Sequence, residues 1–295
     1  MNKVVAIIVT YNRKELLRNC IEALLNSSYP CDLLVIDNNS TDGTKDHIQN
    51  FLNEESIIYH NTGENLGGAG GFQVGIKLAV QRKYSYIWLM DDDTIVHKDA
   101  LEKLMEADQK LKGNYGFLSS IAYWKDGSIC NMNVQRVGIH KKIEEYKEIT
   151  PIIMATFVSF FVKAETVMNV GLPIKEFFIW ADDLEYSRRI SRSMKCYAVP
   201  DSIVEHHMES NEKVNVAKDS PDRMWRYDYL YRNEVYVYRR EGIKGHIYLL
   251  IRMMKHSLLI IKDSKNDRSL RLKRIWKSFG TGYSFKPEIE YMKIE

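Results

Sequence analysis

Apolar runs alternate with amphipathic segments over the first third of the chain, in an order that predicts a parallel sheet. Residues 4–10 form a continuous run rich in β-branched side chains, which is typical of a strand buried on both faces. The next segment keeps apolar residues at helical spacing, and Asn12 with Glu15 predicts a capping box at its start. Further strands are expected at 32–37, 56–61 and 86–90, and helices at 45–53 and from the glycine-rich loop to about residue 82. This alternation indicates a Rossmann-like α/β fold with right-handed crossovers.

The pattern becomes less regular after residue 112. We expect strands at 115–124 and 152–162, a helix at 182–193 and strand segments at 195–207. From residue 222 to about residue 277 the chain reads as mostly helix. The sequence therefore predicts an α/β body that is followed by a helical C-terminal extension.

Charge is distributed unevenly along the 295 residues. Between Arg239 and Lys277 there are twelve lysines and arginines against three acidic residues, a net of +9 within a total of +3, so the remainder carries −6. A basic, apolar-rich tail indicates binding to an anionic lipid surface or to another anionic partner. The alternative is a pair of packed helices whose basic faces are simply solvated. Residues 247–261 are the longest apolar segment, and they are too short and too charged to span a bilayer.

The four cysteines are scattered and form no CxxC pair. This spacing argues against a zinc site or a disulfide scaffold and favours a reducing compartment. The apolar run at the N-terminus is too short for a signal peptide. We therefore expect a cytoplasmic protein, or one that lies peripherally on the inner face of the cell membrane, and no nucleic-acid partner.

Polar residues follow each predicted strand, where ligands bind in open α/β sheets. The first strand ends in Thr10, Tyr11, Asn12 and Arg13, and the second ends in Asp37. Taken singly, each residue could have a purely structural role: Asn12 could cap a helix, and Asp37 could order its turn. Their shared location at strand ends favours a binding site.

A glycine-rich loop that contains Asn65 follows the third predicted strand. Six of the chain's 16 glycines lie within thirteen positions: Gly63, Gly67, Gly68, Gly70, Gly71 and Gly75. Glycines permit close backbone approach and a helix N-terminus favours anions, but the spacing matches neither GxGxxG nor the P-loop. A tight turn with close helix–sheet packing is the alternative to a nucleotide site.

Three consecutive aspartates, Asp91, Asp92 and Asp93, end the fourth predicted strand. Crowded carboxylates raise one another's pKa unless a cation compensates, and Mg²⁺ and Mn²⁺ prefer oxygen ligands and substrate phosphates. Alternation along an extended segment would let Asp91 and Asp93 share one ion while Asp92 faces elsewhere, toward a ribose hydroxyl. The alternative is an acidic helix start capped by Asp93 or Thr94.

A second acidic cluster follows Trp180 and consists of Asp182, Asp183 and Glu185. Carboxylates beside an aromatic residue at a helix start fit sugar recognition and general-base chemistry, although they also complement a helix dipole. Farther on, His206 and His207 end a short strand. Either histidine could be structural or could bind a metal.

These residues lie in five ordered motifs and a histidine pair that together resemble the inverting glycosyltransferases of family 2, which have the GT-A fold. The segments that carry the resemblance are AIIVTYNR, LLVIDNNSTDGT, NLGGAGGF, LMDDDT and FIWADDLEYSRRI, followed by EHH. The resemblance spans about residues 4–207 and looks closest to the galactofuranosyltransferase and rhamnosyltransferase branch. It implies a GT-A catalytic domain over 1–215, with a nucleotide-binding part to about 112 and an acceptor part over 113–215, before a basic helical region over 216–295.

The resemblance also assigns roles to residues. It implies that the nucleotide-sugar is bound by Thr10, Tyr11, Arg13, Asp37, Asn65, Asp91 and Asp92. It implies a metal site for Mn²⁺ or Mg²⁺ at Asp91, Asp93 and a histidine, for which the His-Met context favours His207 over His206. Asp183 is the implied catalytic base, and Trp180 and Asp182 are the implied acceptor-binding residues. Ala181 separates Trp180 from the acidic pair, which departs from the family's usual pattern.

The function that follows is metal-dependent, inverting transfer of a sugar to a glycan hydroxyl in cell-surface polysaccharide synthesis. The expected donor is UDP-galactofuranose and the expected acceptor is lipid-linked, with a rhamnosyl or other hexosyl transferase of the same family as the alternative. A nucleotidyltransferase would need a basic residue in the glycine-rich loop, where none occurs before Lys77. A non-catalytic sugar-nucleotide or glycan-binding protein would lack a base or an intact DxD, and a membrane-surface scaffold would not need the acidic clusters.

Overall fold

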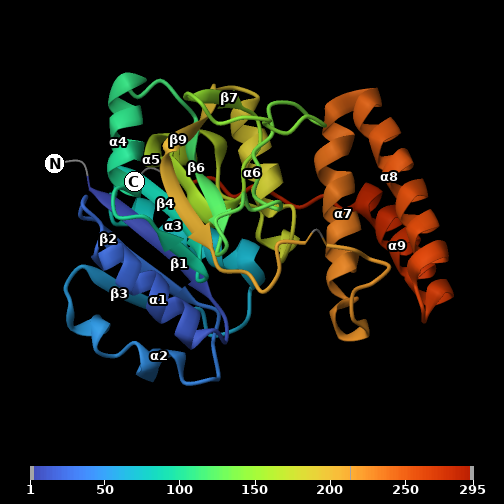
Figure 1. Ribbon diagram of the computed structural model, residues 1–295, viewed down its shortest axis with the longest axis horizontal. Coiled ribbons are helices and arrows are strands. Elements are labelled where there is room, and N and C mark those ends of the chain that lie inside the picture. Colours follow the sequence, from blue (N-terminus) through green and yellow to red (C-terminus); the bar gives the residue numbers. More distant parts are fainter. Residues whose placement is uncertain (1–2, 213, 293–295) are drawn as a thin grey trace.

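Strands and helices alternate along the first third of the computed structural model, which describes residues 3–212 and 214–292 (Figure 1). β1 pairs in parallel with β2 and β4, and β2 pairs in parallel with β3. These strands are β1 Val4–Thr10, β2 Asp32–Asp37, β3 Ile57–Asn61 and β4 Tyr86–Asp91. The helices between them are α1 Lys14–Leu25, α2 Thr44–His47 and α3 Gly67–Gln81. The predicted parallel βαβ arrangement is confirmed.

The second half of the α/β body makes the sheet mixed. In the described residues nine strands form one sheet in the order β3-β2-β1-β4-β8-β6-β9-β5, with β7 paired to β9. β8 runs antiparallel to both β4 and β6, whereas β6 and β9 are parallel. The strands are β5 Thr94–Val96, β6 Phe117–Trp124, β7 Thr150–Ile152, β8 Phe160–Lys163 and β9 Cys196–His206. The helices are α4 Ala100–Lys110, α5 Ala164–Val170 and α6 Asp182–Ser191.

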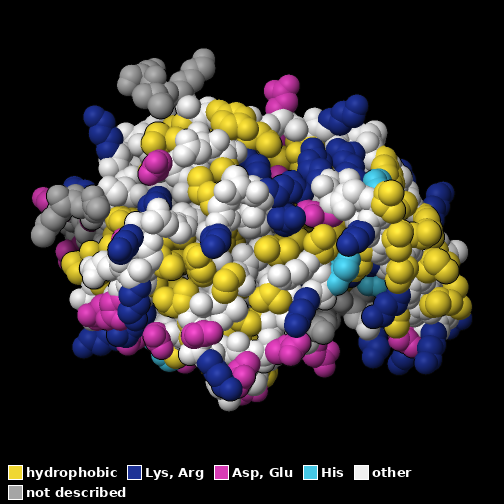
Figure 2. All heavy atoms as spheres, turned by 90° about the horizontal axis from the view of Figure 1, so that it is seen from above, with side chains coloured by type: hydrophobic (Ala, Val, Ile, Leu, Met, Phe, Trp, Pro, Cys, Tyr) yellow, Lys and Arg dark blue, Asp and Glu magenta, His cyan; other side chains and the backbone are white. Residues whose placement is uncertain are grey.

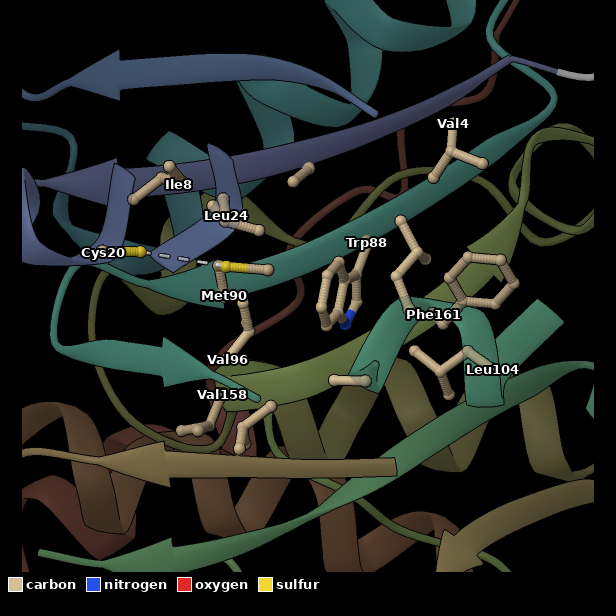
Figure 3. Close-up of a cluster of buried hydrophobic side chains, with 14 of the residues drawn as sticks. Val4, Ile8, Cys20, Leu24, Trp88, Met90, Val96, Leu104, Val158 and Phe161 are labelled. Atoms are coloured by element: carbon tan, nitrogen blue, oxygen red, sulfur yellow. Dashed lines mark hydrogen bonds between the residues drawn. The ribbon is translucent and has the colours of Figure 1, made fainter. Parts of the chain in front are cut away.

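Alternate residues of the central strands fill two cores, one on each face of the sheet. Ile8 of β1 belongs to the core beneath α1 and α4, whereas Ile7 belongs to the core beneath α3 and α6. Figure 3 shows the first core, in which Trp88 and Met90 of β4 lie among side chains from α1, α4 and β8. The Trp88 indole donates to the Ser159 hydroxyl at 2.8 Å, so its polar atom is satisfied inside the core. These buried faces fix the strand ends that carry the site.

The glycines of α3 allow the helix to approach the sheet closely. A Cβ at Gly75 would lie 2.6 Å from Ile7 Cγ2, and one at Gly71 would lie 2.5 Å from Val9 Cγ1. At Gly68, by contrast, a Cβ would meet nothing within 4 Å. Close helix–sheet packing therefore accounts for these two glycines of the loop without a bound nucleotide.

We expect Gly75→Ala to lower the free energy of unfolding by about 1–3 kcal/mol, because the added methyl overpacks the core against Ile7. Gly68→Ala is the matched control. It should raise stability by up to about 1 kcal/mol, because alanine favours helix and the position is open. Urea unfolding monitored by circular dichroism measures both. Equal effects of the two substitutions would contradict the packing role.

Local expectations differ from the structure in four places. Asn12 has φ of 54°, and its side chain accepts a hydrogen bond from the Thr41 backbone at 2.7 Å instead of capping α1, so the predicted capping box is wrong. The helix predicted at 45–53 is α2 followed by one 3-10 turn, Phe51–Asn53. The run 152–162 is divided between β7, a 3-10 turn and β8, and β5 was not predicted.

The predicted C-terminal helical extension is confirmed: α7 Arg226–Tyr238, α8 Gly242–Asp263 and α9 Arg268–Ser284 stand together at one end of the molecule (Figure 1). The segment after α9 returns to the α/β body, where the Leu172 backbone donates to the carbonyl of Glu290 at 2.8 Å. Among the helices that the structure describes, none combines the length and the apolar character needed to cross a bilayer.

Candidate active site

The carboxyl ends of β1, β2 and β4 bring several predicted site residues to one edge of the sheet. Thr10 lies opposite Asp37 in the register of β1 and β2, and Asp91 lies opposite the residue before Thr10 in the register of β1 and β4. The Thr10 hydroxyl donates to Asp92 Oδ2 at 2.7 Å. Because these strands are parallel, the polar residues that follow them collect at the edge where ligands bind in such sheets.

Arg13 compensates part of the negative charge at this edge. Its guanidinium donates to Asp92 Oδ1 at 3.1 Å and to Asp93 Oδ2 at 2.9 Å. Both carboxylates are buried, with 3% and 5% exposure. Burial raises the pKa of Asp92 to about 7, although the charge of Arg13 opposes that rise. Burial therefore raises the pKa of this carboxyl by more than the charge of Arg13 lowers it.

His206, and not the expected His207, lies in the carboxylate cluster. His206 Nε2 is 2.9 Å from Asp93 Oδ1, and one ligand atom from each of Asp91, Asp93 and His206 falls within 4.8 Å of the others. The reason is the pairing of β9 with β5, which sets His206 opposite Thr94 and turns its side chain inward. His207 donates its backbone N–H to the Asp93 carbonyl, and its imidazole pairs with Glu205 at 2.8 Å.

Asn133 fixes the orientation of the His206 ring. The amide nitrogen of Asn133 donates to the Thr156 hydroxyl at 2.8 Å, so its oxygen faces His206 Nδ1 at 2.9 Å and accepts a hydrogen bond from the Nδ1–H. Nε2 is thereby aimed at the carboxylates. Ligating histidines in metal sites are commonly held by such a hydrogen bond at the other ring nitrogen.

The donor set fits a hard divalent cation. Two carboxylates and one imidazole are ligand types that Mg²⁺ and Mn²⁺ accept. Burial and the charge of Asp93 raise the pKa of Asp91 to about 6. Although burial opposes it, the bond to Asp93 raises the pKa of His206 to about 10. Without a metal, Arg13 and His206, whose pKa is raised, are thus the basic groups that contact Asp93.

The acidic helix start at α6 lies within electrostatic range of the same cluster. Burial first, and then the charge of Asp91 among other effects, raise the pKa of Asp183 to about 7. Burial and the charge of Asp183 raise the pKa of Asp182 well above its usual range, and Asp91 contributes there too. Asp183 Oδ1 accepts the Leu184 N–H at 2.6 Å. A carboxylate with a pKa near neutrality at a binding edge is suited to take up a proton.

The loop before α6 has a strained backbone. Phe178, Trp180 and Ala181 have φ of 60°, 65° and 65°, a region that costs non-glycine residues about 1–3 kcal/mol each. The Trp180 ring packs edge-on against Tyr227 of α7, with ring centroids 5.4 Å apart. Strain of this kind concentrates at functional sites, where surrounding structure enforces it.

The other residues predicted to bind the nucleotide-sugar, Asp37, Asn65 and Tyr11, lie at or after the ends of neighbouring strands of the same sheet, and each side chain has a different environment. Asp37 is 1% exposed and accepts hydrogen bonds from the Tyr59 hydroxyl at 2.5 Å and the Ser40 backbone at 2.8 Å. Asn65 accepts the Gly67 N–H at 2.9 Å and so orders the turn into α3. Tyr11 is 43% exposed and leaves its ring available to a ligand.

The fold is that of a GT-A glycosyltransferase, and comparison with protein families agrees. The model of glycosyl transferase family 2 matches residues 5–161, which is more than half of the chain. This protein belongs to glycosyl transferase family 2. It is therefore a glycosyltransferase, as the motifs predict.

Two relatives align with this chain beyond the residues that the family model matches. Galactofuranosyltransferase GlfT1 of Mycobacterium tuberculosis (strain H37Rv) is 26% identical over 267 residues, which cover 82% of this chain and 84% of the relative. The dTDP-rhamnosyl transferase RfbF of Shigella flexneri is 25% identical over 293 residues, which cover 93% of each chain.

Solved structures share the fold. Staphylococcus aureus TarS 1-349 in complex with UDP superposes with a TM-score of 0.53 at 14% identity and covers 96% of this chain and 72% of its own. The mannosyltransferase PcManGT of Pyrobaculum calidifontis, in complex with GDP-Man and Mn²⁺, has a TM-score of 0.56 at 14% identity, with 96% and 75% coverage. At this identity the likeness concerns the fold alone.

Proposed function

We propose that this chain transfers a sugar from a nucleotide-sugar to a glycan hydroxyl with inversion at the anomeric carbon. The observation that carries the proposal is the Asp91–Asp93–His206 cluster at the carboxyl edge of the parallel strands. The raised pKa of Asp183, to which the charge of Asp91 contributes, supports it. A base and a cation site at one edge are what a single displacement at a sugar diphosphate needs.

Each of these residues has a defined part in the reaction. Asp91, Asp93 and His206 would hold Mn²⁺ or Mg²⁺, and that ion, when bound, supplies positive charge to the departing nucleotide diphosphate. Asp183 takes the proton of the acceptor hydroxyl as that oxygen bonds to the anomeric carbon. The bond from this carbon to the diphosphate oxygen breaks, and its electron pair leaves with the nucleotide. Attack opposite to the leaving group inverts the centre.

UDP-galactofuranose is the donor we favour, and a rhamnosyl donor is the second candidate. The name of the GlfT1 relative supports the first and that of RfbF supports the second. The solved neighbours bind UDP, UDP-GlcNAc and GDP-Man, which supports a nucleotide-sugar donor in general. Tyr11, Asp37 and Asn65 would contact its nucleoside, with Thr10, Arg13 and Asp92 beside them, while Trp180 and Asp182 would hold the acceptor.

A donor screen tests this function. Purified protein is incubated with UDP-galactofuranose, UDP-galactose or dTDP-rhamnose, a lipid-linked glycan and Mn²⁺, and the products are read by mass spectrometry. We expect one donor to give a product one sugar heavier, and chelation of the metal to stop the reaction. Binding of a donor without turnover on any acceptor would instead favour a non-catalytic sugar-nucleotide-binding protein.

We also propose that α8 rests on an anionic membrane surface, where a lipid-linked acceptor would be found. The outward face of α8 carries seven large apolar side chains that are each more than half exposed: Ile243, Ile247, Leu250, Ile251, Met254, Leu258 and Ile261. Lysines 244, 255 and 262 are exposed on the same helix. Figure 2 shows hydrophobic side chains gathered at the end of the molecule where α8 lies, with Lys and Arg side chains beside them. An apolar stripe bordered by lysines complements anionic lipid.

The double variant Ile251→Ser/Leu258→Ser should lower partitioning onto vesicles of phosphatidylglycerol and phosphatidylcholine by at least about tenfold, because each side chain contributes about 1.5–3 kcal/mol when buried. Leu25→Ser, on the exposed surface of α1, is the matched control and should change nothing. Co-sedimentation at low and high salt measures both. If wild-type protein does not sediment with anionic vesicles, or if α8 is instead covered in a dimer seen by analytical ultracentrifugation, the membrane role is wrong.

A further inference from the structure

Asn233 of α7 connects the C-terminal helices to the loop that precedes the proposed catalytic base. Its amide nitrogen donates to the carbonyls of Phe177 at 2.9 Å, Ile179 at 3.2 Å and Trp180 at 2.8 Å. Asn233 is 0% exposed. The two N–H donors of one buried amide in the C-terminal extension are thus shared among three backbone acceptors of a loop more than fifty residues earlier in the chain.

The neighbouring arginine fixes the orientation of this amide. Arg232 donates to the Asn233 side-chain oxygen from Nε at 3.0 Å and from a terminal nitrogen at 2.9 Å. A flipped amide would set its nitrogen against the guanidinium and its oxygen against the carbonyls of the loop. Arg232 also donates to the Glu176 carbonyl, and its guanidinium lies over the ring of Phe285, 4.0 Å from the centroid.

The loop held in this way is the one with the strained backbone. Three of its four residues from 178 to 181 have positive φ, and α6 begins immediately afterward at Asp182. The fourth carbonyl in the segment, that of Phe178, accepts the Ala69 N–H at 3.2 Å, so α3 supports the loop from its other side. A backbone of this kind relaxes unless its surroundings enforce it. The Asn233 amide is well placed to do so.

We propose that Asn233 is a positioning residue that holds the backbone of residues 177–181 so that α6 presents Asp183 at the cation cluster. This inference rests on the proposed function for the role of Asp183. It gives the C-terminal extension a part in building the active site, in addition to any contact with a membrane.

Hydrogen exchange measured by mass spectrometry tests the positioning without a substrate. In Asn233→Ala we expect the amides of residues 177–185 to exchange at least about tenfold faster, because the carbonyls lose their donor and the strained loop opens. Binding of UDP with Mn²⁺ should stay within about twofold of wild type. Tyr231→Phe is the matched control, since it removes a partly buried hydrogen bond of 2.6 Å to His256 from the same helix and removes no hydrogen bond to the loop. The control should leave exchange of the loop unchanged.

Asn233→Asp separates hydrogen-bond donation from packing, because it preserves the shape and places a carboxylate oxygen against the three carbonyls. We expect the turnover number for sugar transfer to fall by about 10- to 100-fold in Asn233→Ala and further in Asn233→Asp, with the donor KM nearly unchanged. Activity of the Asp variant equal to or above that of the Ala variant would show a packing role and overturn the proposal.

Arg232→Gln keeps the proposal testable if the Asn233 variants do not fold. Arg232 is only partly buried, and its loss should speed exchange of residues 177–185 by a smaller factor. Unchanged exchange of this loop in every folded variant would contradict the inference. If wild-type protein transfers no sugar while the exchange results are as expected, the proposed function fails and the positioning of the loop stands.

Discussion

Asp183→Asn should reduce sugar transfer by at least about 100-fold and leave nucleotide binding nearly intact. The amide cannot accept the proton of the acceptor hydroxyl, and removal of a positioned base typically costs about 10²–10⁴ in rate. Donor binding should persist, because the proposed metal ligands and the strand ends of β1 and β2 are untouched. Transfer is measured at saturating donor, and binding of UDP with Mn²⁺ is measured by calorimetry.

Asp201→Asn is the matched control for this experiment. It makes the same chemical change at an exposed position of β9, so transfer should stay within about twofold of wild type, as is usual for surface substitutions. If Asp183→Asn retains comparable transfer, Asp183 is not the base, and Asp182 becomes the carboxylate to test next.

His206→Ala should weaken Mn²⁺ binding at least about tenfold, whereas His207→Ala should change it by less than about twofold. The two histidines are neighbours in sequence, yet only His206 places a ring nitrogen in the cluster with Asp91 and Asp93. Loss of the His206 ring removes a ligand, and loss of the His207 ring removes a partly exposed pair with Glu205. Titration of Mn²⁺ alone, followed by electron paramagnetic resonance, measures both affinities without a nucleotide.

Each of the two histidine variants is the control for the other, because each removes one imidazole from the same segment. Weaker binding in His207→Ala than in His206→Ala would restore the assignment that the His-Met context suggests. Equal affinity in both variants and in wild type would remove histidine from the metal site altogether.

The sequence predicts the central parallel strands well, because each strand is a short continuous apolar run followed by polar residues. The burial of Val4–Thr10 and Tyr86–Met90 is visible in the residue types alone. The same pattern places Thr10, Asp37 and Asp91 at one edge, since parallel strands that are neighbours must end together. The role of the glycine-rich loop is ambiguous from sequence alone, because glycines are needed both for close helix–sheet packing and for a phosphate-binding loop. In the structure, Gly71 and Gly75 pack closely on β1.

The contacts that complete the site could not be predicted from sequence, because they depend on pairings between distant segments. The choice between His206 and His207 follows from the pairing of β9 with β5, a three-residue strand with no clear pattern of its own. Asn133 lies in a polar connection, and Asn233 lies in a helix that reads as part of a basic tail. Nothing in the local sequence marks either asparagine. Their roles arise only when the fold brings Asn133 to His206 and Asn233 to the loop at Phe177–Trp180.

The anomeric configuration of the product tests the central claim most directly. The donor that is active in the screen is turned over on its acceptor with Mn²⁺, and the new linkage is assigned by nuclear magnetic resonance, with Asp183→Asn as the blank. A single displacement with Asp183 as base predicts a linkage of configuration opposite to that of the donor. A product that retains the donor's configuration would contradict the account, because it would require a second displacement or a different arrangement of the reacting groups.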